Sequence, residues 1–64
     1  MAPKSIQEYP EIMNIAEAAE FLRVHRTTIQ RVAKSGELRS YLLGSRRLLL
    51  KRDLLAFFEK KVAR

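Results

Sequence analysis

The sequence has no cysteine, one histidine, and only two glycines and two prolines among its 64 residues. Without cysteine there is neither a disulfide framework nor a thiolate metal site, and His25 has no second histidine with which to bind a metal. No long apolar run is present: the stretch LLAFF at 54–58 is far too short to cross a bilayer. The start of the chain also lacks a signal-peptide stretch. We therefore expect a soluble, cytoplasmic domain with no metal, cofactor or small-molecule ligand.

Basic charge is what the sequence has in excess, with thirteen Lys and Arg against seven Asp and Glu and a net charge of +6. Residues 1–22 carry one lysine against four glutamates, or net −3, whereas residues 23–64 carry twelve basic against three acidic residues, or net +9. A basic region of this strength favours phosphate backbones or anionic lipid, and the acidic start could meet a neighbouring copy's basic part, head to tail. So small a chain buries only roughly 60% of its unfolded surface, which leaves no room for a deep catalytic cleft. Its carboxylates suit capping and helix-end roles, so we expect no enzyme.

Residues 1–12 show no hydrophobic periodicity and contain Pro3 and Pro10, which predicts a flexible arm ahead of a domain at 13–64. A first helix is predicted from about Ile15, because Asn14 and Glu17 have the spacing of a capping box. Its apolar stripe at i, i+3, i+4 and i+7 comprises Ile15, Ala18, Ala19 and Leu22.

A second helix is predicted after a short corner at 23–25, with His25 as a capping residue. Its apolar positions are Ile29, Val32 and Ala33, and it should end at Ser35-Gly36, where glycine can adopt a left-handed conformation. If the apolar positions face inward, Thr27, Gln30, Arg31 and Lys34 face solvent, with Arg26 beside them.

Residues 38–50 predict a β-hairpin, because leucine-rich runs flank Gly44-Ser45. Its register stays open: a two-residue turn pairs Leu43 with Arg46, and a three-residue loop pairs it with Arg47. A closing helix is predicted from about Arg52, with an apolar set expected in the core: Leu54, Leu55, Phe57, Phe58 and Val62.

Two helices at a tight corner, a basic hairpin and a closing helix predict a mainly α fold with a small β-hairpin, the winged helix-turn-helix. The motifs EAAEFL at 17–22, RTTI at 26–29, GEL at 36–38 and DLLAF at 53–57 follow the order of the excisionase-type, MerR-like DNA-binding domain, which residues 13–59 resemble. Two positions depart from that pattern: Arg23 replaces the usual corner glycine, and His25 replaces a capping serine. Keeping the left-handed corner at Arg23 would cost about 1 kcal/mol or more.

In such a fold the exposed face of the second helix enters the DNA major groove. The residues assigned to this recognition helix are Arg26, Thr27, Thr28, Gln30, Arg31 and Lys34. For Thr28, packing against the core and a phosphate hydrogen bond remain alternatives. The residues assigned to the wing and the DNA backbone are Ser45, Arg46, Arg47 and Lys51, although the arginines could also be ordinary edge charges that prevent aggregation.

The resemblance implies an excisionase, or recombination directionality factor, of a mobile genetic element that binds repeated sites and bends DNA for an integrase. A small regulator of the same fold binding promoter repeats is one alternative. A protein-interaction module with incidental positive charge is another. RNA binding is weaker still, since no aromatic platform for stacked bases is visible.

Overall fold

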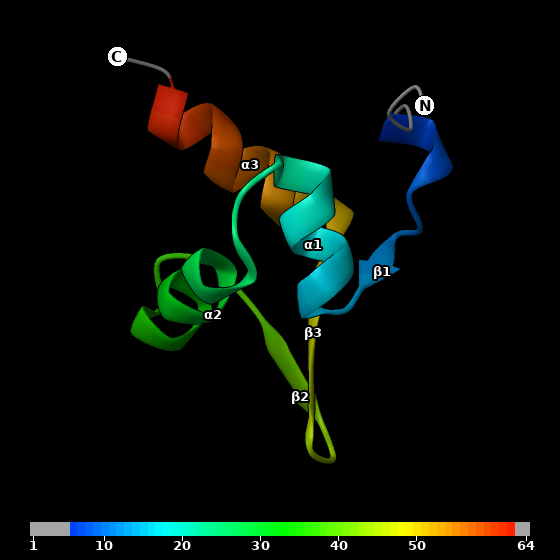
Figure 1. Cartoon of the computed structure of the whole chain (residues 1–64), viewed down its shortest axis with the longest axis vertical. Coiled ribbons are helices and arrows are strands. Elements are labelled where there is room, and N and C mark those ends of the chain that lie inside the picture. The colour runs from blue at the N-terminus through cyan, green and yellow to red at the C-terminus, as the bar shows by residue number, and fades with distance from the viewer. Residues whose placement is uncertain (1–5, 63–64) are drawn as a thin grey trace.

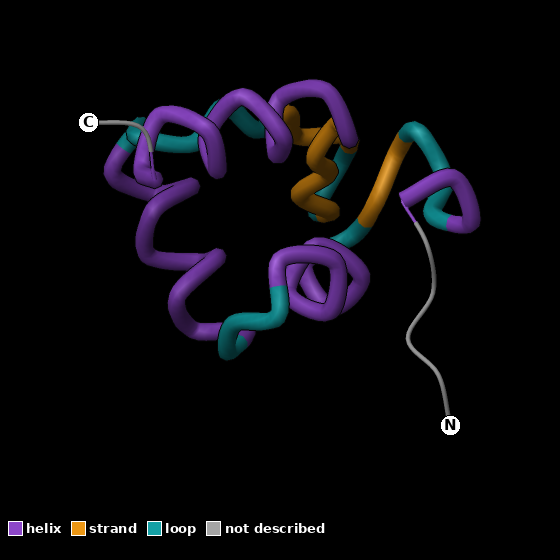
Figure 2. Tube along the Cα trace, turned by 90° about the horizontal axis from the view of Figure 1, so that it is seen from above, coloured by secondary structure: helices purple, strands orange, loops and turns teal. Residues whose placement is uncertain are grey.

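The computed structural model describes residues 6–62, which form three helices around a small antiparallel sheet (Figure 1). The elements, in order, are η1 (Ile6–Glu8), β1 (Ile12–Met13), α1 (Ile15–Leu22), α2 (Arg26–Ser35), β2 (Tyr41–Leu43), β3 (Arg46–Leu50) and α3 (Lys51–Val62). The strand order is β1-β3-β2. The hairpin β2–β3 projects from the helical body, and its strands look foreshortened when seen from above (Figure 2). The predicted mainly α fold with a two-stranded wing is confirmed.

Helix α1 begins as its capping signal predicts. The Glu17 backbone N–H donates to Asn14 Oδ1 at 2.7 Å, and the Asn14 N–H donates to Glu17 Oε1 at 3.0 Å. These two bonds satisfy donors that would otherwise lack a partner at the helix start. The helix buries Ala18 and Ala19, whose small side chains allow α2 to pack closely.

The corner between α1 and α2 keeps the left-handed conformation, with Arg23 at φ 60° and ψ 43°. The Val24 N–H donates to the Ala19 carbonyl at 3.0 Å and the Arg23 N–H to the Glu20 carbonyl at 3.2 Å, the pair of bonds of a Schellman motif. His25 then caps α2, because its side chain accepts a hydrogen bond from the Thr27 backbone N–H at 3.3 Å. The predicted capping role of His25 is confirmed.

Part of the segment expected to be a flexible arm, residues 1–12, packs against the body; its residues 1–5 lie outside the described residues. Tyr9 is only 7% exposed and packs edge-on against Phe21, with ring centroids 4.9 Å apart. The Tyr9 hydroxyl also donates to Glu20 Oε2 at 3.1 Å. Strand β1 pairs with β3, and its second residue, Met13, is fully buried. A two-residue strand is too short to show a period, so the sequence pattern missed it.

The wing has the shorter of the two registers that the sequence left open. Leu43 pairs with Arg46 and Leu42 with Arg47, so the turn is the two residues Gly44-Ser45. Gly44 has φ 64°, the positive value that the first central position of a type II′ turn requires.

The core lies where α1, α2, α3 and the sheet meet. Its largest fully buried side chains are Met13, Ile29, Leu38, Leu49 and Leu54. The prediction that Phe58 and Val62 of α3 lie in the core is wrong, because Phe58 is 48% exposed and Val62 is 56% exposed. Helical spacing placed them on the apolar stripe, but α3 extends past the end of the body that it packs against, so its last two turns have less to cover them.

Candidate nucleic-acid interface

Helix α2 divides its side chains as its period predicts. Ile29, Val32 and Ala33 are buried against the body, and Thr28 is half-buried at their edge. The exposed positions are Arg26, Thr27, Gln30, Arg31, Lys34 and Ser35. The outer face of α2 is therefore formed by hydrogen-bond donors and is not covered by α3.

Two grooves join this helix to the wing. The first, about 380 Å³, is lined by Asn14, Ile15, Ala16, Arg26, Gln30, Arg46 and Arg47. The second, also about 380 Å³, is lined by Ile15, Gln30, Lys34, Ser45 and Arg47. Gln30 and Arg47 line both, so α2 and the wing flank one continuous concave surface, which we call the α2–wing groove.

Every charged side chain that lines the α2–wing groove is basic. Among residues 6–62, the ion pairs are Lys51 with Glu11 and Lys61 with Glu37, so none of the basic groove residues is neutralised by a carboxylate. Arg47 is half-buried and donates to Ser40 Oγ at 2.6 Å, which holds its guanidinium at the base of the wing. The groove thus presents unneutralised positive charge to a ligand.

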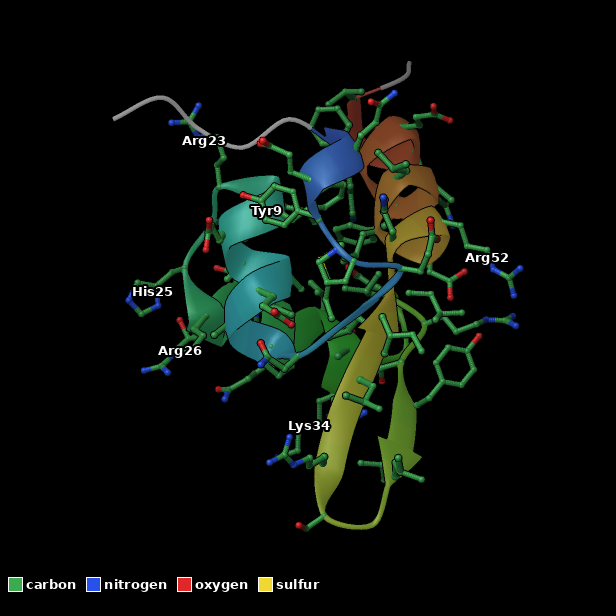
Figure 3. All side chains as sticks on the ribbon, turned by 90° about the vertical axis from the view of Figure 1, so that its right-hand side faces the viewer. Tyr9, Arg23, His25, Arg26, Lys34 and Arg52 are labelled. Carbon is green, nitrogen blue, oxygen red and sulfur yellow. The ribbon has the colours of Figure 1, made fainter. Side chains whose placement is uncertain are left out.

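The basic side chains of α2 and of α3 lie on different sides of the molecule. Figure 3 shows Arg26 and Lys34 on the same side, whereas Arg52 extends from the opposite side. The basic residues are therefore spread over more than one face, but α2 and the wing place several of them together.

Four of the residues singled out from the sequence lie outside the α2–wing groove: Thr27, Thr28, Arg31 and Lys51. Lys51 has a side chain only 12% exposed, with its Nζ 3.7 Å from Glu11 Oε2, and its backbone N–H donates to the Glu11 carbonyl at 2.8 Å. Thr27 and Arg31 are exposed on the adjoining face of α2, and the Thr27 hydroxyl lies 3.0 Å from His25 Nδ1. Lys51 thus ties β1 to the start of α3, while Thr27 and Arg31 extend the surface beyond the groove.

Sequence reasoning missed the contribution of α1 to the groove. Asn14, Ile15 and Ala16 all line it, although the sequence accounted for Asn14 as a cap and for Ile15 as part of an apolar stripe. No local pattern could have identified them, because their position depends on how α1 packs across the base of the wing.

Two features are absent from the described part of the chain. Within residues 6–62, no three His, Asp or Glu side chains gather where a metal ion could bind. No helix among these residues is long and apolar enough to span a membrane.

The fold and its exposed second helix define the class of winged helix-turn-helix proteins, and comparison with known proteins agrees. Residues 12–62 match the model of a family described as a helix-turn-helix domain, and the chain belongs to that family. This membership supports DNA binding.

The curated relatives add no function of their own. The chain is 37% identical over 62 residues to the uncharacterized protein Rv2310 of Mycobacterium tuberculosis, and equally to the uncharacterized protein Mb2337 of Mycobacterium bovis. The match covers 94% of this chain and 54% of each relative, so the chain spans about half the length of those proteins. No solved structure matches the chain significantly.

Proposed function

We propose that this chain binds double-stranded DNA sequence-specifically, with α2 in the major groove and the wing against the adjacent backbone and minor groove. The observation that carries the proposal is the α2–wing groove, whose charged side chains are all basic and come from both elements. A major groove about 12 Å wide admits an α-helix, and the second helix of a helix-turn-helix is the one that enters it.

The exposed residues of α2 divide between base reading and phosphate binding. Arg31 can donate two hydrogen bonds to guanine O6 and N7, and Gln30 can bridge adenine N6 and N7. Thr27 suits a thymine methyl group or a phosphate, and Lys34, near the end of the helix, suits a phosphate. Arg26 lies in the first turn of α2, where the helix dipole already favours an anion, so it is assigned to a phosphate.

Thr28, which is half-buried on α2, contributes less to the proposed DNA surface than the exposed residues do. Thr28 packs at the edge of Ile29, and any phosphate contact it makes is secondary.

The wing residues Ser45, Arg46 and Arg47 form the second contact. Ser45 and Arg46 are exposed at and beside the turn, while Arg47 lies lower and is oriented by Ser40. Arginines at this position suit phosphates or a narrow minor groove. Lys51 is assigned to holding β1 instead, because of its pairing with Glu11.

The biological role that we propose is that of an excisionase, which binds repeated sites and bends DNA for an integrase. The support is the order of its motifs and its size: a single module buries only about 600–1,000 Å² on DNA, so useful affinity calls for several copies or a partner. The acidic start of the chain could contact the basic surface of the next copy, head to tail. A transcription regulator that binds promoter repeats is the alternative for the same surface.

A salt titration tests DNA binding against incidental charge. Affinity for a random duplex should fall steeply with salt, with a logarithmic slope near −0.9 per neutralised phosphate. Arg31→Glu should abolish selection of a preferred sequence from a randomised pool, whereas Arg52→Glu, on the opposite side, should keep the same preferred sequence. If affinity were insensitive to salt, or if Arg31→Glu selected the same sites as wild type, DNA recognition by α2 would be refuted.

A reconstituted recombination assay separates the two biological roles. The purified protein should stimulate excision by the integrase encoded beside it, on a substrate carrying its own attachment sites. Stimulation of excision supports the excisionase role. A change in promoter output with no effect on excision would support the regulator.

A further inference from the structure

The wing carries two apolar side chains that the fold does not use. Leu42 and Leu43 are 65% and 69% exposed, more than any other large hydrophobic side chain among residues 7–62. Both lie on β2, an edge strand of the sheet. Exposed apolar residues on an edge strand favour aggregation, so two large ones at the end of the wing suggest a partner that covers them. A serine or threonine at either position would leave the core unchanged.

Each leucine lies directly across from an arginine of β3. Leu42 pairs with Arg47 and Leu43 with Arg46, and the two pairs face opposite sides of the hairpin because neighbouring residues of a strand alternate. Each face of the hairpin therefore carries one of the leucines and one of the arginines. That combination suits a partner with an apolar interior between two rows of negative charge.

The tip of the wing is also narrow. It turns through only Gly44-Ser45, and a Cβ placed on Gly44 would meet nothing within 4 Å, so the end of the hairpin stands clear of the body. The same arginines line the α2–wing groove, which makes the leucines continuous with the proposed DNA surface.

We propose that Leu42 and Leu43 form an apolar wedge that enters the DNA minor groove and opens a base step, while Arg46 and Arg47 bind the phosphates on either side. This inference rests on the proposed function. The minor groove is only about 6 Å wide and two paired strands are already about 4.8 Å apart, so leucine side chains enter it only by widening the groove. Apolar wedges that unstack a base step kink DNA by about 20–90°. The wedge therefore gives the wing a mechanical role in addition to charge neutralisation.

The test uses the double variant Leu42→Ser/Leu43→Ser, with Val62→Ser as a matched control. Val62 is 56% exposed at the end of α3, so its replacement removes exposed apolar surface away from the wing. The probe is a duplex enriched from a randomised pool by the wild-type protein. Permanganate oxidation of thymines reports unstacking, energy transfer between dyes at the two DNA ends reports bending, and fluorescence anisotropy gives the affinity.

With wild type and Val62→Ser, thymines at one end of the footprint should become permanganate-sensitive and the DNA ends should approach. The double variant should lose both signals and bind about tenfold more weakly, since two leucines lose part of their apolar burial, while its salt slope stays unchanged. The single variant Leu43→Phe, which keeps a large apolar group at this position, should keep the bend. Thermal melting of each variant checks that the exposed substitutions leave the fold intact.

The outcomes separate the wedge from the function on which it rests. Salt-dependent binding by the double variant with wild-type bending and permanganate sensitivity would overturn the wedge and leave DNA binding in place. If instead the double variant bends DNA normally but loses self-association in sedimentation, the leucines join copies of the chain and the wedge is again overturned. If wild type binds no duplex, both the proposed function and the wedge fail.

Discussion

At the scale of single residues, Arg23 holds a backbone conformation that its side chain disfavours. Its φ of 60° lies in the left-handed region, which costs a residue with a Cβ roughly 1–2 kcal/mol. The conformation persists because it lets Arg23 and Val24 donate to the last carbonyls of α1. A corner with this geometry sets the angle between α1 and α2, so the strain is retained where α2 is positioned.

We predict that Arg23→Gly raises the free energy of unfolding by about 0.5–1 kcal/mol, because glycine removes the strain but has more freedom in the unfolded chain. Urea denaturation of the two proteins measures this change. Gly36→Ala, at φ 92°, is the opposite control and should destabilise the protein. A less stable Arg23→Gly variant would show that the arginine side chain stabilises the corner.

Tyr9 makes the stability of the fold depend on pH in the alkaline range. Burial raises the pKa of the Tyr9 hydroxyl above its usual value near 10, and the hydrogen bond to the Glu20 carboxylate raises it further. Because the folded pKa is raised, the stability that Tyr9 contributes is present below pH 10 and is lost as the pH rises through the folded pKa.

We therefore predict that the stability advantage of wild type over Tyr9→Phe is constant from pH 8 to about pH 9 and shrinks as the pH rises above about 10. Thermal melts of both proteins across this range measure the difference, and comparison with Tyr9→Phe cancels the titration of the lysines. A constant difference would contradict a raised pKa of the Tyr9 hydroxyl.

At the scale of elements, β1 contributes to the core although it has only two residues. Its two residues alternate, so Met13 faces the core and Ile12, at 56% exposed, faces solvent. We predict that Met13→Ala costs about 2–4 kcal/mol, since it leaves a cavity in a small core. Ile12→Ala, one residue away, should cost less than about 1 kcal/mol. Urea midpoints of the two variants measure the contrast, and equal effects would mean that β1 is not held as described.

The helices and β1 differ in how far their own sequences determine them. Helices α1 and α2 were predictable because caps, a stop signal and a 3.6-residue period all lie within each segment. The strand β1 and the burial of Tyr9 were not, because both depend on contacts with residues far along the chain. The wing was intermediate: its existence followed from Gly44, but its register needed the pairing of Leu43 with Arg46.

At the scale of the whole molecule, the basic side chains fall into those that line the α2–wing groove and those that are paired with carboxylates. Lys34 lies in the α2–wing groove without a carboxylate partner, whereas Lys51 is paired with Glu11. We predict that Lys34→Ala makes the logarithmic salt slope of duplex binding shallower by about 0.9, and that Lys51→Ala leaves it unchanged while lowering stability. Anisotropy titrations at four salt concentrations measure both slopes. Equal changes in slope would show that the groove does not define the DNA surface.

The sequence by itself determined the three helices, the hairpin and the outward face of α2, because periodicity, caps and turn residues act over a few neighbouring positions. Only the tertiary structure decided which basic residues meet. It placed Arg46 and Arg47 beside Gln30, enclosed Lys51 under β1, brought the start of α1 into the groove and left Phe58 uncovered. The physical reason is that charge and apolar area are properties of the chain, whereas their partners are set by packing between distant segments.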